Sequence, residues 1–239
     1  MSYSKLIIIL LNFLDYFQQK KIINLINNKF SKSITVFDVG AHYGETVKLF
    51  LKKLNVSKIY SFEASPQNFR VLERNVSKTQ MNKVEIFNYG IGDRITKNYI
   101  NQTLESSSST INKLNEDSKY FKKNLKILNI KKKESFYHKL PITILTLDYF
   151  IEKNNIQNID LLKIDTEGYE LNVILGATET LKSTEFVLAE VRHNHESFEG
   201  VYKLHEFVNA MHDNGFVLSM IITAKPFIAD LCFQPKNNL

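Results

Sequence analysis

Residues 36–47, VFDVGAHYGETV, decide how the rest of this 239-residue sequence is interpreted. An apolar run that contains Asp38 meets two glycines four positions apart, Gly40 and Gly44, before helix-forming residues begin. This order is typical of a strand, a tight nucleotide-binding turn and a helix. His42 stands where the dinucleotide fingerprint has its middle glycine. The stretch therefore raises the question of which small molecule the turn binds.

The composition is that of an ordinary globular chain, with 44% hydrophobic and 23% charged residues, and it excludes extensive disorder. The net charge of +6 admits nucleic acid, an anionic membrane or a phosphorylated substrate as a partner, but requires none of them. The single cysteine, Cys232, excludes an intramolecular disulfide, favours a cytoplasmic setting and is expected to be a buried packing thiol.

Residues 6–11 form an apolar core near the N-terminus that is too short to span a bilayer, so we expect no transmembrane segment. The apolar residues that follow recur at a rough helical spacing with lysines beside them. Residues 1–30 are therefore predicted to contribute an accessory amphipathic helix that covers part of the sheet.

Beyond the turn, short apolar strands alternate with helical stretches, which indicates a sheet built from βαβ units. We expect a single α/β domain over residues 1–239, with a doubly wound, mostly parallel sheet of seven strands that ends in an antiparallel hairpin. A helix that ends at Asn154 is expected to be capped by Thr146 or Asp148. The strands are predicted at residues 34–39, 58–63, 84–88, 159–165, 186–191, 216–223 and 227–233, and other helices at 45–54, 66–78, 166–181 and 201–215.

Regular patterning lapses between the third and fourth predicted strands, at residues 94–140. This stretch contains ESSSST at 105–110 and the basic run KKNLKILNIKKK at 122–133. A segment of this length inside a compact domain is typical of a lid, a substrate loop or an inserted hairpin. Two interpretations stay open, a solvated surface insertion and a cap over the active site.

Acidic residues recur where the predicted strands end. In an open α/β sheet the ligand binds beyond the carboxyl ends of the strands, so acids at these places are candidate ligand contacts. The acids at strand ends are Asp38, Glu63, Asp93, Asp165 and Glu190.

The turn disfavours a dinucleotide. His42 fills the place where a pyrophosphate would approach the backbone, and Glu45 puts a carboxylate near the start of the following helix. A ligand with ribose and adenine but a cationic or zwitterionic tail fits better, because Asp38 and Glu45 attract an ammonium or sulfonium group. S-adenosylmethionine is such a ligand. Glu63 lies at the distance from the turn at which an acid binds the ribose hydroxyls in dinucleotide folds.

Four stretches together resemble the FkbM-type S-adenosylmethionine-dependent methyltransferases: VFDVGAHYGETV, IYSFEASPQNFRVLERN, NYGIGD and TLDYFIEKNNIQNIDLLKIDTEGYELNVILGA. The resemblance runs from about residue 34 to residue 191, is weakest between residues 93 and 140, and has IDTEGYE as its most specific motif. It implies a class I, Rossmann-like methyltransferase fold and O-methylation, often of sugars or secondary metabolites. It does not fix the acceptor.

The resemblance also implies roles for individual residues near the first turn. Asp38, Gly40 and Gly44 correspond to the turn at the methionine end of the cofactor, and Glu63 corresponds to the acid that holds the ribose. We expect His42 to contact the cofactor as well, although it replaces the asparagine that the family would have in that turn. This departure affects the detail of the turn and leaves the cofactor assignment in place.

Two further matches concern the adenine and the acceptor. Gly92 and Asp93 correspond to the segment near the adenine, where Asp93 either receives the exocyclic amine or caps a turn. Asp165 and Glu167 correspond to the motif where the methyl acceptor approaches, and Asp165 is counted among the cofactor contacts as well.

Methyl transfer to an alcohol is an in-line displacement that needs alignment and a base near the methyl group. Asp165 and His193 are the favoured bases, and Glu170 is interpreted as an acid on a helix surface. The candidate bases at the appropriate strand ends are Asp165, Glu167, Glu190, His193 and His195.

Three alternatives remain. Mg²⁺ held by Asp165, Glu190 and Asn194 would assist the same reaction, but this spacing is no recognised metal signature, so a metal is not favoured. A nicotinamide-dependent oxidoreductase is disfavoured by the missing glycine. A nucleic-acid methyltransferase is unlikely because the lysine run at 122–133 has no aromatic residue to stack bases. That run instead favours an anionic small-molecule or carbohydrate acceptor, such as a phosphorylated or nucleotide-linked sugar.

Overall fold

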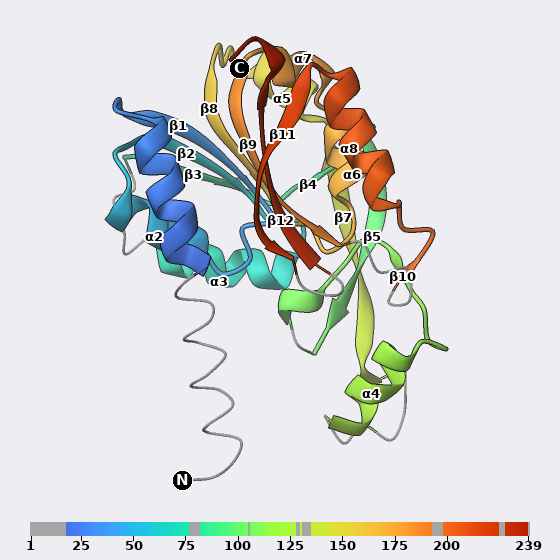
Figure 1. Cartoon of the computed structure of the whole chain (residues 1–239). Helices are drawn as coiled ribbons and strands as arrows, with labels where there is room; N and C mark the ends of the chain where they lie inside the picture. The colour runs from blue at the N-terminus through green and yellow to red at the C-terminus, as the bar shows by residue number, and fades with distance from the viewer. Residues whose placement is uncertain are drawn as a thin grey trace, which may run out of the picture.

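A computed structural model describes residues 18–76, 82–104, 106–127, 130, 135–192, 198–224 and 228–238. Its centre is a seven-stranded sheet with the order β11-β12-β9-β8-β1-β2-β3 (Figure 1). Strand β12 is antiparallel to both of its neighbours, and the other pairs are parallel, so the predicted mostly parallel sheet with a terminal hairpin is confirmed. The strands are β1 (Ile34–Val39), β2 (Val56–Phe62), β3 (Val84–Phe87), β8 (Ile159–Ile164), β9 (Thr184–Arg192), β11 (Phe216–Ala224) and β12 (Ile228–Pro235).

The central strands are buried on both faces, which explains their continuous apolar runs. In β1 and β8, Val36 and Leu161 pack into one hydrophobic cluster, whereas the adjacent Phe37 and Leu162 pack into the other. This alternation follows from the two-residue period of a strand. Strand β1 pairs with β2 on one side and with β8 on the other, so the order of the sheet reverses between β1 and β8.

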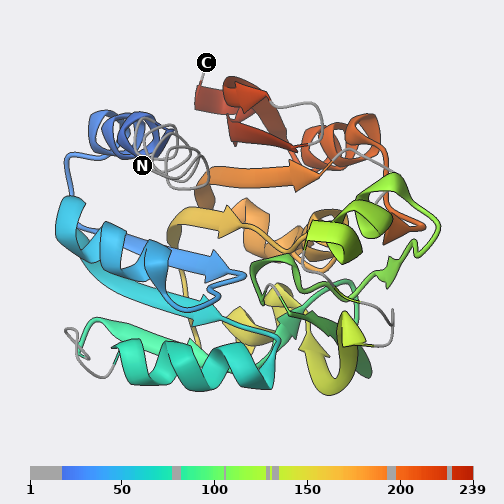
Figure 2. The same cartoon turned by 90° about the horizontal axis from the view of Figure 1, so that it is seen from below.

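Helices cover both faces of the sheet, as expected for a doubly wound fold (Figure 2). The N-terminal helix, described from residue 18 to residue 29, packs with α2 and α3 on one face through Ile23 and Ile26. Four other helices cover the second face. The helices of the two layers are α2 (Glu45–Lys53), α3 (Pro66–Val76), α5 (Leu147–Lys153), α6 (Glu170–Leu175), α7 (Thr178–Lys182) and α8 (Leu204–Asp213).

The segment between β3 and β8 is more regular than predicted. Thr96–Thr103 (β5) and Tyr137–Leu145 (β7) pair antiparallel over eight residues and form a second sheet with Gly90–Ile91 (β4). Strand β5 is mostly polar, so its sequence shows no apolar alternation. The smaller elements are η1 (Ser106–Ser108), β6 (Lys113–Leu114), α4 (Lys119–Ile127), β10 (Phe198–Glu199) and η3 (Lys236–Asn238).

The single helix predicted over residues 166–181 is wrong, because the structure has two short helices there, α6 and α7. The helix is interrupted at Gly176, where the Cβ of any other residue would lie 2.0 Å from the carbonyl oxygen of Gly92. Both predicted caps are used, but for different helices. The Thr146 hydroxyl accepts a hydrogen bond from Tyr149 N at the start of α5, whereas Asp148 accepts one from Thr180 N in α7.

Phe150 of α5 joins the helix to three strands, since its ring lies edge-on to Phe62 and Phe87, each 4.8 Å away, and to Phe37 at 6.0 Å. We expect Phe150→Ala to destabilise the protein by about 3–5 kcal/mol in urea unfolding, because it leaves a cavity in this cluster. The adjacent Tyr149 is 36% exposed, and Tyr149→Ala should cost less than about 1 kcal/mol. Equal losses for both variants would contradict this account.

Candidate active site

The turn after β1 is shaped by three residues with positive φ: Gly40 (86°), His42 (48°) and Gly44 (87°). At Gly40 a Cβ would lie only 1.7 Å from the carbonyl oxygen of Asp165, so no other residue fits. The backbone N–H groups of Gly40 and Ala41 both donate to the carbonyl of Phe62, at 2.9 Å. The turn therefore ties the carboxyl ends of β1, β2 and β8 together.

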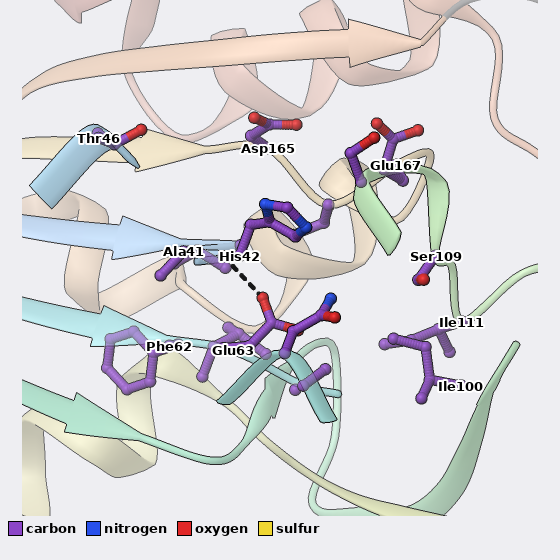
Figure 3. Close-up of a pocket in the computed structure, with 18 of the residues that line it drawn as sticks. Ala41, His42, Thr46, Phe62, Glu63, Ile100, Ser109, Ile111, Asp165 and Glu167 are labelled. Atoms are coloured by element: carbon purple, nitrogen blue, oxygen red, sulfur yellow. Dashed lines mark hydrogen bonds between the residues drawn. The ribbon is translucent and has the colours of Figure 1, made fainter. Parts of the chain in front are cut away.

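Glu63, directly after β2, is fixed by the same turn. One carboxylate oxygen accepts the backbone N–H of His42 at 2.8 Å (Figure 3), and the other accepts that of Ser65, also at 2.8 Å. Its side chain is buried, and this burial raises its pKa to about 7. Each carboxylate oxygen has a further lone pair that a hydroxyl can use.

Lys163 of β8 lies at the centre of the site. Its ammonium is 3.2 Å from Asp38 and 3.3 Å from Asp165, and it also donates to the carbonyl oxygen of Gly40 at 3.3 Å. Burial alone would lower the pKa of Lys163, but the charges of Asp38 and Asp165 raise it, so the side chain stays protonated. Asp38 is completely buried and acts on the site through this lysine.

The loop after β8 is held by Glu170, and the interpretation of this residue as a surface acid is wrong. Glu170 is fully buried, and one of its oxygens accepts the backbone N–H groups of Thr166 at 3.1 Å and Gly168 at 2.8 Å. Its other oxygen accepts the hydroxyl of Tyr202. These bonds stabilise a loop in which Glu167 has a φ of 56°, which is uncommon for a residue with a side chain.

Three carboxylates meet at this edge of the sheet. Oxygens of Asp165, Glu167 and Glu190 lie within 4.8 Å of one another, close enough to share a cation. Glu167, however, forms an ion pair with Arg192. Burial is the main reason that the pKa values of Glu167 and Glu190 are raised to about 8. His193, Asn194 and His195 follow Arg192 and lie outside the described residues.

These elements enclose a pocket of about 330 Å³ at the carboxyl ends of β1, β2 and β8. Glu63 and Asp165 line it from the main sheet, and Ile100, Ser109 and Ile111 line it from the insertion (Figure 3). The insertion thus covers the site, which favours the cap over the simple surface loop. The lysines of α4 play no part, because no described residue of α4 lines this pocket.

His42 connects the turn to the cap. Its Nε2 lies 2.8 Å from the hydroxyl of Ser106, and its ring stacks on Tyr43 at 3.8 Å. Ser106 in turn donates to the hydroxyl of Tyr43 at 2.7 Å. The histidine that replaces the expected asparagine therefore binds part of the protein itself while lining the pocket.

The remaining predicted residues lie beside the pocket and do not line it. Gly44 precedes α2 and packs against Leu72. Gly92 packs against Tyr169, and Asp93 pairs with Arg94 at 2.6 Å. Tyr89, Gly90 and Ile91 take the lining positions on that side.

A second pocket adjoins the first. It has a volume of about 590 Å³ and lies between the N-terminal helix, α2 and the ends of β8 and β9. The residues that line both pockets are Glu45, Thr46, Lys163, Asp165 and Glu190. The site therefore consists of two compartments with Asp165 and Lys163 in their common wall.

The strand order, the antiparallel terminal hairpin and the glycine turn facing Glu63 are those of a class I S-adenosylmethionine-dependent methyltransferase fold. Within this class the chain belongs to the FkbM methyltransferase family, whose domain model, Methyltransferase FkbM domain, matches residues 38–218. The family resemblance inferred from the sequence is thereby confirmed.

Two curated relatives are each 25% identical to this chain. The hexuronic acid methyltransferase AglP of Haloferax volcanii aligns over 173 residues, 72% of this chain and 62% of its own length. The 2-O-methyltransferase NoeI of Sinorhizobium fredii aligns over 182 residues, 74% of this chain and 70% of its own. The chain thus spans less than two thirds of AglP.

Solved structures agree on the fold. The methyltransferase FkbM of Methylobacillus flagellatus superposes with a TM-score of 0.54 at 16% identity, over 85% of this chain and 44% of its own. A SAM-dependent methyltransferase of Aquifex aeolicus gives a TM-score of 0.50 at 14% identity, over 91% of this chain and 89% of its own. Among the described residues, no helix has the length and apolar character needed to cross a membrane.

Sequence reasoning missed Lys163 and Glu170, although both left a signal. Lys163 is, with Asp160, one of two charged residues in the fully buried strand β8, and a charge in such a strand must be paired. Glu170 follows Gly168 by two residues, at the start of a helix where a carboxylate can accept backbone N–H groups. The family resemblance assigns no role to either residue.

The close approach of Gly40 to Asp165 predicts a large effect of a single methyl group. Gly40→Ala should reduce stability by at least about 3 kcal/mol in urea unfolding, or displace the turn enough to abolish S-adenosylmethionine binding in calorimetry. Gly215 is a matched control, because its φ of 84° is similar but nothing lies within 4 Å of its Cβ position. Gly215→Ala should cost only about 1–2 kcal/mol and leave binding intact. Similar behaviour of the two variants would show that the contact is unimportant.

The buried carboxyls predict a pH dependence of stability. The pKa values of Glu63 (about 7), Glu167 (about 8) and Glu190 (about 8) all exceed the unfolded value of 4.5. Between pH 4.5 and these raised pKa values the folded state therefore binds more protons than the unfolded state. The melting temperature of the ligand-free protein should fall as pH rises from about 5 to about 8. Glu63→Gln should reduce this slope below pH 7, whereas Gln at the exposed Glu73 should not. An unchanged slope in Glu63→Gln would contradict the assignment.

Proposed function

We propose that this chain is an S-adenosylmethionine-dependent O-methyltransferase that acts on a hydroxyl group of a carbohydrate. Membership of the FkbM family supports the methyl-transfer chemistry. The names of AglP and NoeI, a hexuronic acid methyltransferase and a 2-O-methyltransferase, support a sugar hydroxyl as the acceptor. The observation that carries the proposal is the position of Asp165 in the wall between two adjoining pockets.

The first pocket fits S-adenosylmethionine. Gly40 lines it in a turn that packs directly on the backbone of Asp165, Glu63 offers carboxylate lone pairs suited to two ribose hydroxyls, and Ile100 and Ile111 provide apolar surface for the adenine. Glu45 and Asp165 add negative charge that suits the ammonium and sulfonium groups of this cofactor. When bound, S-adenosylmethionine supplies an electrophilic methyl group on a positively charged sulfur.

Asp165 is the proposed general base. Its side chain is about one third exposed and lines both pockets, so an acceptor hydroxyl in the second pocket can reach it. Lys163, 3.3 Å away, holds the carboxylate in place through an ion pair. Asp165 would accept the proton of the acceptor hydroxyl as its oxygen takes the methyl group, while the methyl–sulfur bond of the cofactor would break and leave neutral S-adenosylhomocysteine as the second product.

The other predicted bases have weaker support. Glu167 is paired with Arg192, and this ion pair occupies the carboxylate that would have to accept a proton. We assign Glu167 a positioning role in the loop after β8, where its carbonyl oxygen accepts the hydroxyl of Thr110 at 2.8 Å. His193 lies outside the described residues, and His193→Ala belongs in the same kinetic series as a test of the second candidate.

Asp165→Asn should lower kcat by about 10²–10⁴-fold, whereas S-adenosylmethionine affinity, measured by calorimetry, should fall by a smaller factor because Glu45 and Glu63 remain in the cofactor pocket. Glu63→Gln should do the opposite, weakening cofactor binding with a smaller effect on kcat at saturating cofactor. The two isosteric variants thus serve as controls for each other in assays with methyl-labelled donor and a panel of sugars. Turnover by Asp165→Asn at the wild-type rate would refute the assignment of the base.

A metal-assisted reaction is the second candidate, since Asp165, Glu167 and Glu190 approach one another closely enough to hold a divalent cation. Turnover that persists in a strong chelator and does not rise with added Mg²⁺ supports direct base catalysis. Loss of turnover in the chelator, restored by Mg²⁺, would support the metal instead.

A further inference from the structure

The second pocket has the two kinds of wall that a sugar ring needs. Ile22 of the N-terminal helix, Leu49 of α2 and Leu188 of β9 form an apolar side. Gln18 and Gln19, from the first described turn of the N-terminal helix, form part of a polar side. A sugar ring presents C–H groups on its faces and hydroxyl groups at its edge, so it complements both walls. The volume of about 590 Å³ lies in the usual range for small-molecule sites.

The charges of this pocket are strongly unequal. Four acidic side chains line it, those of Glu45, Asp165, Glu190 and Asp230. Because the pKa of Glu190 is about 8, Glu190 holds a proton at neutral pH, and three carboxylates face the single cation Lys163. Lys163 is already engaged with Asp165 and, behind the pocket, with buried Asp38. Among the described residues that line the pocket, no second cation is available to pair with an anionic group.

The pairing of β9 with β12 shows that acidic groups are already crowded in this pocket. Glu190 and Asp230 are directly opposite each other in the antiparallel pair, and like charges at such positions repel. Together with burial and Asp165, this neighbour raises the pKa of Glu190. A further negative charge placed here would add to the repulsion, whereas uncharged hydroxyl groups can donate hydrogen bonds to the carboxylates.

We propose that the pocket between the N-terminal helix and α2 binds the methyl acceptor, and that it selects an uncharged, hydroxyl-bearing ring over an anionic one. This inference rests on the proposed function and names the substrate class of the same site. It replaces the anionic acceptor that the lysine run at 122–133 favoured, because no described residue of α4 lines this pocket.

The N-terminal helix is placed to determine this selectivity. The side-chain amide of Gln18 donates to Asp230, which also accepts the hydroxyl of Thr223, so the helix is anchored to the sheet at the mouth of the pocket. Gln19, the next residue, is exposed and lines the same pocket. A positive charge at position 19 would partly balance the negative charge of the pocket without disturbing the core.

The experiment compares Gln19→Lys with Asn28→Lys, which makes the same change at an exposed position of the same helix away from the pocket. The probes are methyl glycosides of common hexoses and of the corresponding uronic acids. Binding is followed by ligand-observed NMR in the presence of S-adenosylhomocysteine, and turnover by transfer of labelled methyl. We expect the wild type to prefer the uncharged member of each pair by at least about tenfold, and Gln19→Lys to narrow this ratio by about three- to tenfold.

The outcomes separate this inference from the function on which it rests. If calorimetry detects no binding of S-adenosylmethionine, the proposed function fails, and this inference fails with it. If the cofactor binds but the uronic acids are preferred, or no glycoside binds, the inference alone is overturned. The same holds if Gln19→Lys and Asn28→Lys behave alike. A ratio that narrows only in Gln19→Lys supports the pocket as the acceptor site.

Discussion

The site depends on the ion pairs that the buried ammonium of Lys163 forms. The ammonium lies between Asp38 at the end of β1 and Asp165 after β8, and it binds the carbonyl oxygen of Gly40 as well. These groups come from the two strands at which the order of the sheet reverses. Removing one partner of a buried pair leaves a charge without compensation, which costs about 3–5 kcal/mol. The same contacts that hold the switch point together therefore also orient the proposed base.

The chemistry of the site follows from an excess of negative charge in a confined space. The protein compensates Asp38 and Asp165 with Lys163, and Glu167 with Arg192. The remaining carboxylates are left to attract positive charge and to accept hydrogen bonds from hydroxyls. The proposed cationic cofactor and uncharged acceptor would satisfy these demands together, because the cofactor would supply positive charge next to the acceptor.

The sheet and its ligand-binding edge were predictable because both follow from local patterns. Apolar runs gave the seven strands, and the spacing from Gly40 to Glu63 indicated where a ribose would bind. The polar strand β5 was not predictable, since it is stabilised by its pairing with β7 and not by burial of alternate residues. Local patterns signalled that Lys163 and Glu170 need partners, but they could not identify Asp38 and Tyr202, which are distant in the sequence.

The attachment of the cap has a consequence for the catalytic cycle. At Ser106 the cap is held to the turn and to α3 by hydrogen bonds from His42 and Asn68 and by none of the large core contacts that hold the sheet. Such bonds contribute about 0.5–1.5 kcal/mol each, so this part of the cap can open at a small fraction of the free energy needed to unfold the sheet. Opening there would uncover the proposed cofactor pocket and leave the second pocket unchanged, because no described residue of the cap lines the second pocket.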